Sequence, residues 1–238
     1  MAPQGTSSTT WVIHIHGLGS TRAGTLYGVQ VASEAGLTSL VVTYRNDGEG
    51  PMMGTGRSEF GATEVDDVRA AVDFARENGA HTVILFGWSM GAAIALQLAA
   101  DPLLRGIVVG LVLESPVLDW VATIKANCMR SGLPAWTGAF AQPWLGWLLL
   151  SRVSRLAHPV ALRIFDWIAR ADELAVSTVI LHGALDASSP FALSTRFRSQ
   201  RPNMVGLESF HADHTMTWNS DRWRGVVTSR ISNFQVTV

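Results

Sequence analysis

Hydrophobic residues along this chain gather in short runs that are separated by polar and glycine-rich segments. Runs of large and β-branched residues predict six strands, at residues 11–16, 39–44, 82–88, 107–114, 178–182 and 205–210. Apolar positions at helical spacing, with the usual end signals, predict helices at residues 25–35, 63–77, 90–100, 191–198 and 222–234. Because strands alternate with helices, the pattern predicts an α/β fold in which a mainly parallel sheet of about six strands carries helices on both faces.

The alternation stops between residues 116 and 173, which contain no strand-like run. This segment carries five of the nine tryptophans, Trp120, Trp136, Trp144, Trp147 and Trp167. We expect it to form a helical cap, inserted into one core domain made of residues 1–115 and 174–238. Small-molecule sites are mostly apolar, so our candidates for lining a substrate pocket are Met129, Trp136, Phe140 and Trp144. Most cap residues are expected only to pack onto the sheet, and an exposed apolar cap would favour lipid interfaces.

Composition and charge remove several classes of function. The formal net charge is −1 and no basic run occurs, so nothing indicates nucleic-acid binding. The single cysteine, Cys128, excludes an internal disulfide and a cysteine-based zinc site. Residues 133–150 carry no charge, but two prolines and two glycines interrupt them. A spanning helix needs about 20 apolar residues, so we expect no membrane insertion.

Residues 1–10 are small and polar and lack the charged start and apolar run of a signal peptide. We therefore expect a cytoplasmic protein. No two histidines flank a glutamate at the helical spacing of a zinc protease, so we expect no metal. We expect a small-molecule substrate, no cofactor, and a monomer or homodimer.

The sequence Gly87-Trp88-Ser89-Met90-Gly91 matches the pattern G-x-S-x-G and lies between a predicted strand and a predicted helix. In such a place the serine occupies a sharp strand-to-helix turn that projects its hydroxyl toward solvent, and small neighbours relieve the crowding of the turn. The N-terminus of the following helix favours negative charge at the same point. The alternative is an ordinary turn in which the serine caps the helix.

Three motifs in this order resemble the α/β-hydrolase superfamily, and the resemblance spans nearly the whole chain. They are His16-Gly17-Leu18-Gly19 after the first strand, the turn at Ser89, and the late pair Asp186 and His214. The chain most resembles bacterial serine esterases and lipase-like hydrolases with a helical cap. The resemblance implies that Ser89 is a nucleophile, that His214 is its base, and that Asp186 orients the histidine.

One feature departs from the superfamily, which usually has one or two antiparallel strands before the strand that leads to the His-Gly motif. Here ten residues precede that strand. We therefore expect a sheet that is shorter at this edge or is completed by a partner, since an uncovered edge strand invites association.

Two neighbouring residues compete for these roles. His211 directly follows the last predicted strand, whereas His214 lies further into the loop, where triad geometry places the base, so we favour His214. Asp213 adjoins His214, but adjacent side chains in an extended loop point apart, so we favour Asp186. His182, at the end of the preceding strand, is expected to pack under Asp186.

Acyl transfer also needs two backbone N–H groups that bind the negative oxygen of the intermediate. We expect these from Met90, which follows the nucleophile, and from Leu18, which lies between two glycines. Together these residues predict hydrolysis of a carboxylic ester through an acyl-enzyme, with an apolar acyl or alcohol group. A thioesterase, a monoacylglycerol lipase or a serine peptidase would use the same residues. A non-catalytic ligand receptor on the same fold is the alternative from a different class.

Overall fold

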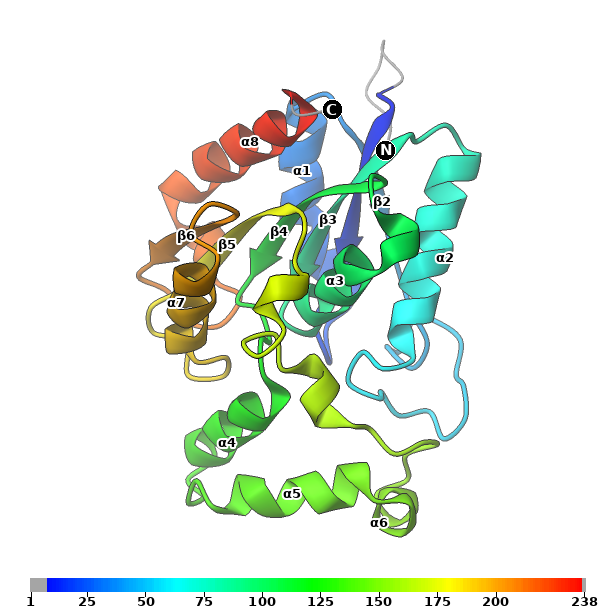
Figure 1. Cartoon of the computed structure of the whole chain (residues 1–238), viewed down its shortest axis with the longest axis vertical. Coiled ribbons are helices and arrows are strands. Elements are labelled where there is room, and N and C mark those ends of the chain that lie inside the picture. The colour runs from blue at the N-terminus through cyan, green and yellow to red at the C-terminus, as the bar shows by residue number, and fades with distance from the viewer. Residues whose placement is uncertain (1–7, 237–238) are drawn as a thin grey trace.

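A computed structural model of the chain describes residues 8–236. Its strands form one sheet in the order β2-β1-β3-β4-β5-β6, and all neighbouring strands run parallel (Figure 1). The strands are β1 (Thr10–Ile15), β2 (Thr38–Val41), β3 (Thr82–Trp88), β4 (Val108–Glu114), β5 (Ser177–Gly183) and β6 (Val205–Phe210). The predicted sheet of six parallel strands is confirmed.

The α-helices of the described range surround this sheet and extend beyond one end of it. They are α1 (Leu26–Glu34), α2 (Glu64–Glu77), α3 (Met90–Ala100), α4 (Trp120–Arg130), α5 (Thr137–Gly146), α6 (Leu148–Val153), α7 (Phe191–Gln200) and α8 (Asp221–Val236). The five helices predicted from spacing correspond to α1, α2, α3, α7 and α8.

Alternate strand residues pack into two hydrophobic layers, one on each face of the sheet. In β1, Ile13 and Ile15 join the layer that contains residues of α2, α3 and α7. Val12 joins the layer that contains residues of α1 and α8. All residues of β3 are buried, as expected for a strand covered on both faces. This central strand therefore holds the residue that follows it, Ser89, in a rigid position.

Strand β2 is shorter than the predicted strand 39–44 because the chain leaves the sheet before Tyr44. The Tyr44 hydroxyl instead donates a hydrogen bond of 2.8 Å to the backbone carbonyl of His16, in the loop after β1. The last residues of the predicted strand thus make a tertiary contact instead of pairing in the sheet, and the edge strand β2 is only four residues long.

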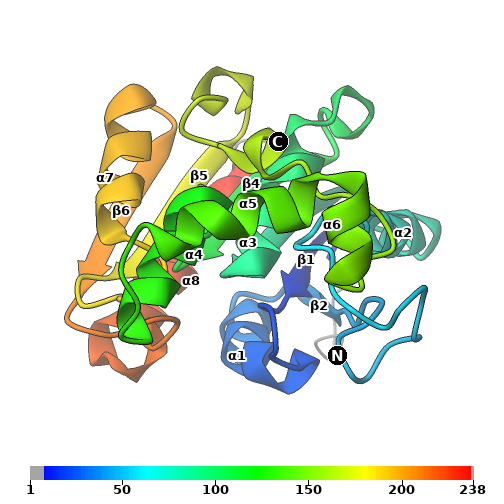
Figure 2. The same cartoon turned by 90° about the horizontal axis from the view of Figure 1, so that it is seen from below.

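Helices α4, α5 and α6 lie beyond the carboxyl ends of the strands, below the sheet in Figure 1 and in front of it in Figure 2, which views the molecule from below. Several hydrogen bonds tie residues 120–158 to the loop before α2, including one from the Thr55 hydroxyl to the Arg155 carbonyl. The Trp120 indole donates one of 3.0 Å to the Phe60 carbonyl, and the His158 amide donates one of 2.9 Å to the Glu59 carboxylate. No helix within residues 8–236 has the length and apolar character needed to cross a bilayer.

Candidate active site

Ser89 occupies the turn between β3 and α3 in a backbone conformation that is rare for a residue with a side chain. Its φ is 52° and its ψ is −112°. Such conformations cost on the order of 1–3 kcal/mol and persist only where their surroundings enforce them. The Ser89 amide donates to the Glu114 carbonyl at 2.9 Å, and the Val117 amide donates to the Ser89 carbonyl at 3.2 Å. Within the described chain the hydroxyl forms no capping bond to α3, which argues against an ordinary capping serine.

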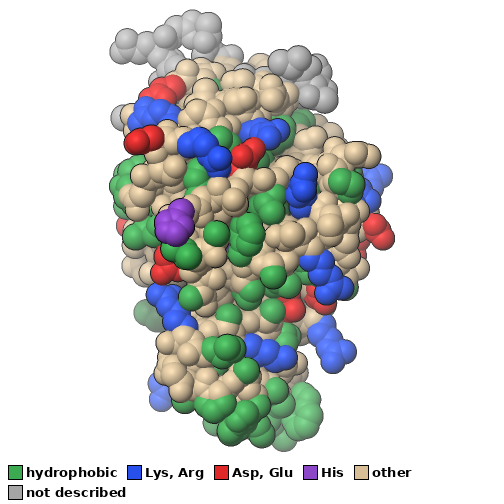
Figure 3. All heavy atoms as spheres, turned by 90° about the vertical axis from the view of Figure 1, so that its left-hand side faces the viewer, with side chains coloured by type: hydrophobic (Ala, Val, Ile, Leu, Met, Phe, Trp, Pro, Cys, Tyr) green, Lys and Arg blue, Asp and Glu red, His purple; other side chains and the backbone are tan. Residues whose placement is uncertain are grey.

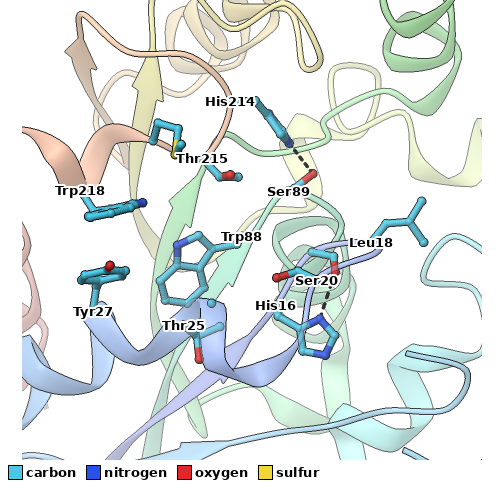
Figure 4. A pocket seen from close by; sticks show the side chains of 13 residues that line it. His16, Leu18, Ser20, Thr25, Tyr27, Trp88, Ser89, His214, Thr215 and Trp218 are labelled. Atoms are coloured by element: carbon cyan, nitrogen blue, oxygen red, sulfur yellow. Dashed lines mark hydrogen bonds between the residues drawn. The ribbon is translucent and has the colours of Figure 1, made fainter. Parts of the chain in front are cut away.

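The imidazole of His214 lies beside the Ser89 hydroxyl, with Nε2 at 3.0 Å from Oγ (Figure 4). His214 belongs to the loop between β6 and α8. Backbone hydrogen bonds hold this region against the loop after β5, from the Ala184 amide to the Phe210 carbonyl (2.7 Å) and from the Leu185 amide to the Ala212 carbonyl (3.1 Å). Three segments that are distant in sequence therefore meet at the carboxyl end of the sheet.

The carboxylate of Asp186 receives hydrogen bonds on both oxygens. Oδ2 lies 2.8 Å from His214 Nδ1 and 3.1 Å from His182 Nε2, and Oδ1 accepts the amides of Ser188 and Ser189 at 2.8 Å each. An ionised carboxylate can only accept, so Nδ1 of His214 carries a proton. In a neutral imidazole Nε2 is then an acceptor, and it faces the Ser89 hydroxyl.

The ionisation of Asp186 follows from these bonds. Burial raises the pKa of its carboxyl, but the hydrogen bonds from His182, His214 and the Ser189 amide outweigh burial and hold the pKa well below its ordinary value. The group is therefore a carboxylate at neutral pH, and it can stabilise a positive charge on His214.

The carboxyl of Glu114, the last residue of β4, has a raised pKa, in contrast to that of Asp186. Burial raises the pKa of its side chain to about 7, although the carboxyl accepts the Trp223 indole N–H at 3.1 Å and the Thr217 amide at 3.3 Å. No role was predicted for Glu114 from the sequence, where it is recognisable only as an acidic residue that ends an apolar strand.

The two competing residues, His211 and Asp213, do not contact the groups that a base and an orienting carboxylate would have to contact. His211 is exposed, and no hydrogen bond within the described chain joins it to Ser89 or Asp186. Among residues 8–236, the Asp213 carboxylate accepts hydrogen bonds only from backbone amides, those of His214 at 2.7 Å and Ala187 at 3.5 Å. It therefore contacts the backbone of His214 rather than its ring.

The loop after β1 runs directly against the serine turn. A Cβ atom on Gly17 would lie 3.1 Å from the Cβ of Ser89. The buried His16 fixes this loop, because its Nε2 lies 3.0 Å from the Asp47 carboxylate and its ring stacks on Tyr44 at 4.2 Å between centroids.

The two residues expected to bind the negative oxygen both lie next to the serine turn. Leu18 follows His16 and Gly17 and is half exposed. Met90 begins α3, where a helix leaves backbone N–H groups without intrahelical partners. The His-Gly motif was predicted from the sequence, whereas the supporting roles of Tyr44 and Asp47 were not.

Two cavities reach Ser89 and His214 from different sides. The first, which we call the wide cavity, has a volume of about 500 Å³ and lies against α4, with Phe60, Val117, Trp120, Ile124 and Leu133 in its wall. The second, the narrow cavity, has a volume of about 250 Å³, and its wall includes Ser20, Thr25, Tyr27, Trp88 and Trp218. Figure 4 shows the rings of Tyr27 and Trp218 facing each other at the end away from Ser89, and they stack at 3.9 Å.

The cap residues expected to line a substrate pocket are not beside the serine. Met129, Trp136, Phe140 and Trp144 line neither of these two cavities, and each is 44–64 % exposed. These two cavities therefore give the four candidates no support, and there is a physical reason for this. Apolar content identifies a segment, but which helix face turns toward Ser89 depends on how α4 and α5 pack. The aromatic residues of the narrow cavity were not identified either, since they come from separate segments.

The sequence matches the model of the alpha/beta hydrolase family over residues 12–229. No curated protein matches it. Several solved structures share the fold. An esterase of Pyrococcus furiosus, Pf2001, is 19 % identical, with 96 % of this chain and 81 % of that chain covered and a TM-score of 0.70.

A monoacylglycerol lipase of Paleococcus ferrophilus is also 19 % identical, covering 98 % of this chain and 96 % of that chain at a TM-score of 0.66. Est1E of Butyrivibrio proteoclasticus, solved with ferulic acid bound, is 18 % identical over 100 % of this chain and 92 % of that chain, at a TM-score of 0.66. At these identities the similarity shows the fold alone. The match of the family model over most of the chain shows more: the chain belongs to the alpha/beta hydrolase family.

Proposed function

We propose that this protein is a serine hydrolase that cleaves carboxylic esters through an acyl-enzyme intermediate. The observation that carries the proposal is the 3.0 Å contact between Ser89 Oγ and His214 Nε2, with His214 Nδ1 held by the Asp186 carboxylate. A serine hydroxyl is a weak nucleophile at neutral pH and needs a base within hydrogen-bond reach. The esterases and the lipase of the same fold are consistent with this chemistry.

In the proposed reaction, Ser89 Oγ attacks the ester carbonyl and its proton passes to His214 Nε2. The negative charge of Asp186 stabilises the imidazolium, and the amides of Leu18 and Met90 bind the carbonyl oxygen as it becomes negative. His214 then protonates the leaving alcohol. Water, deprotonated by His214, attacks the acyl-enzyme, releases the acid and restores Ser89. These steps require no cofactor.

The two cavities support separate binding places for the acyl part and the alcohol part of the ester. We assign the acyl chain to the wide cavity, whose wall includes Val117, Ile124 and Leu133. We assign the alcohol to the narrow cavity, whose wall combines Ser20 and Thr25 with the aromatic rings of Tyr27, Trp88 and Trp218. Its volume of about 250 Å³ suits an alcohol of one ring, since a cavity of about 150 Å³ holds benzene. As part of the same proposal, cap residues 116–173 form the unit that shapes the acyl side, and the enzyme works in the cytoplasm as a monomer or homodimer.

The test combines a fluorophosphonate probe, which labels reactive serines, with turnover of p-nitrophenyl butyrate. We expect rapid labelling of the wild type, no labelling of Ser89→Ala, and turnover lowered roughly 10³-fold or more by Ser89→Ala and by His214→Ala. His211→Ala is the matched control and should retain activity. A folded wild type that neither reacts with the probe nor hydrolyses any ester of a chain-length series would contradict the proposal and favour a receptor. Activity lost in His211→Ala and kept in His214→Ala would refute our choice of base.

A further inference from the structure

The cap carries a large exposed apolar surface, which we call the cap face. Nine large hydrophobic residues between positions 129 and 153 are 44–75 % exposed. They are Met129, Leu133, Trp136, Phe140, Trp144, Trp147, Leu148, Leu149 and Val153. Figure 3 shows hydrophobic side chains gathered over the lower end of the molecule, where the cap lies in Figure 1. A gathering of exposed apolar side chains of this size marks an interaction site.

The charges of the same segment all have one sign. Residues 120–165 contain no Asp or Glu, and their five cations are Lys125, Arg130, Arg152, Arg155 and Arg163. All five are exposed, and none forms an ion pair with another residue of the described range 8–236. Elsewhere arginines do pair with acids, for example Arg69 with Asp101 at 2.6 Å. Residues 120–165 therefore form a positively charged end on a chain whose formal net charge is −1, and the acids of the cap, Asp119, Asp166, Asp172 and Glu173, lie only near the two ends of segment 116–173.

We propose that the cap face docks the protein on an anionic lipid surface. Aromatic and leucine side chains bury their apolar parts at the boundary between headgroups and acyl chains, and flanking Lys and Arg side chains attract anionic headgroups. Helix α5 is suited to lie flat on such a surface, because Trp136, just before it, and Phe140 and Trp144 within it follow at intervals of four residues along one side. Tryptophan is favoured at this depth of a bilayer.

A second copy of the chain fits this surface less well. A two-fold dimer pairs the same patch of both copies, so it would bring two sets of unpaired cations together. Like charges that face each other across an interface repel, whereas an anionic bilayer neutralises these cations. The charge pattern therefore favours the lipid surface over self-association.

The cap face is continuous with the candidate active site. Leu133 belongs to the cap face and also to the wall of the wide cavity, which reaches Ser89. Docking would place the mouth of that cavity at the lipid surface, from which an apolar substrate could enter. The docking itself requires no catalysis, so its test does not depend on the proposed function.

The test is cosedimentation of the full chain with vesicles of phosphatidylcholine alone and of phosphatidylcholine with 30 % phosphatidylglycerol, at low and at physiological salt. We expect at least tenfold tighter binding to the anionic vesicles and weaker binding at the higher salt. The double variants Trp147→Ser/Leu149→Ser and Arg130→Gln/Arg152→Gln should each weaken that binding by about tenfold or more.

Matched controls come from exposed residues away from the cap. Leu103, which is 82 % exposed and follows α3 at the amino end of the strands, is replaced in Leu103→Ser, and Arg196 on α7 in Arg196→Gln. Both should bind anionic vesicles like the wild type, and circular dichroism checks that every variant is folded. Absence of wild-type binding, or equal loss in cap and control variants, overturns the proposal. So does a stable dimer by light scattering that Trp147→Ser/Leu149→Ser dissociates, because the cap face would then be a homodimer interface.

Discussion

The amide of Ser89 donates its hydrogen bond to the backbone carbonyl of Glu114, at 2.9 Å. The bond joins the ends of two adjacent strands at the point where β3 turns into α3. The Glu114 side chain extends the connection, because it accepts hydrogen bonds from Trp223 on α8 and from the backbone of Thr217. One buried residue thus braces both the strained serine turn and the segment that follows His214.

This connection should make stability depend on pH through Glu114. Its pKa is about 7 in the folded protein, raised by burial from an ordinary value of 4.5. Between these values the folded state binds more protons than the unfolded state, so the contribution of Glu114 is fully present below about pH 4.5 and is lost as pH rises through about 7. Relative to Glu114→Gln, the wild type should lose on the order of 2–3 kcal/mol of unfolding free energy between pH 5 and pH 8. Urea unfolding at several pH values measures the difference.

Glu77→Gln serves as the control, since Glu77 is exposed at the end of α2. It should follow the wild type across the pH range. Parallel stability profiles for wild type and Glu114→Gln would show that Glu114 is not the group that titrates.

The glycine before the serine turn should tolerate no side chain. A Cβ atom on Gly87 would lie 2.5 Å from the Gly91 carbonyl oxygen and 2.6 Å from the Ala92 Cα. These are backbone atoms, so α3 itself would have to move. Gly87→Ala should lower the free energy of unfolding by about 1–3 kcal/mol or more and reduce esterase activity together with it.

Gly225→Ala is the matched substitution, because Gly225 lies in α8 and the added carbon would meet no described atom within 4 Å apart from its chain neighbours and the adjacent helix backbone. There alanine should leave stability unchanged or raise it by up to about 1 kcal/mol. Urea denaturation compares the two variants. A Gly87→Ala protein as stable as Gly225→Ala would mean that the turn is less tightly packed than described.

Replacing the Asp186 carboxylate should damage catalysis more than binding. In Asp186→Asn the side-chain amide can donate a proton toward His214 Nδ1, which favours the wrong tautomer of the imidazole, so we expect kcat to fall by roughly 10³–10⁴ with little change in KM. The control is Asp213→Asn, since Asp213 contacts only backbone amides, and it should stay within about tenfold of the wild type. Steady-state kinetics on p-nitrophenyl butyrate measures kcat and KM for both variants. Equal losses in the two variants would count against Asp186 as the orienting group.

The same variant should reveal the depressed pKa of Asp186. A folded-state pKa below the ordinary 3.8 means that the carboxylate stabilises the fold above that pH and that the stabilisation is lost as pH falls further. The stability difference between wild type and Asp186→Asn should therefore be larger at pH 7 than at pH 3. Thermal unfolding at the two pH values measures it, and a difference that grows on acidification would contradict the assignment.

The parts of the fold that sequence predicted are those that local pattern determines. The buried run of β3 and the G-x-S-x-G motif locate Ser89 without any long-range information. Asp186 and His214 became candidates through the resemblance to the α/β-hydrolase superfamily, combined with their places just beyond strand ends. The end of β2 could not be predicted, because Tyr44 leaves the sheet to bond the carbonyl of His16, 28 residues earlier in the chain. The pocket residues could not be predicted for the same reason: Trp218 stacks on Tyr27 only because α1 and the loop before α8 meet in space.

The division of the substrate between two cavities can be tested by filling each one separately. Ile124 lines the wide cavity and Ser20 the narrow one. Ile124→Trp should lower kcat/KM for p-nitrophenyl octanoate at least about tenfold relative to p-nitrophenyl acetate, because only the longer acyl chain needs the filled space. Ser20→Leu should instead discriminate between alcohols, lowering kcat/KM for phenyl butyrate relative to methyl butyrate while leaving the preference among acyl chains unchanged. If Ile124→Trp altered the alcohol preference and Ser20→Leu the acyl preference, the two cavities would have to exchange roles. If both variants altered both preferences alike, each substrate would lie across both cavities and the assignment would fail.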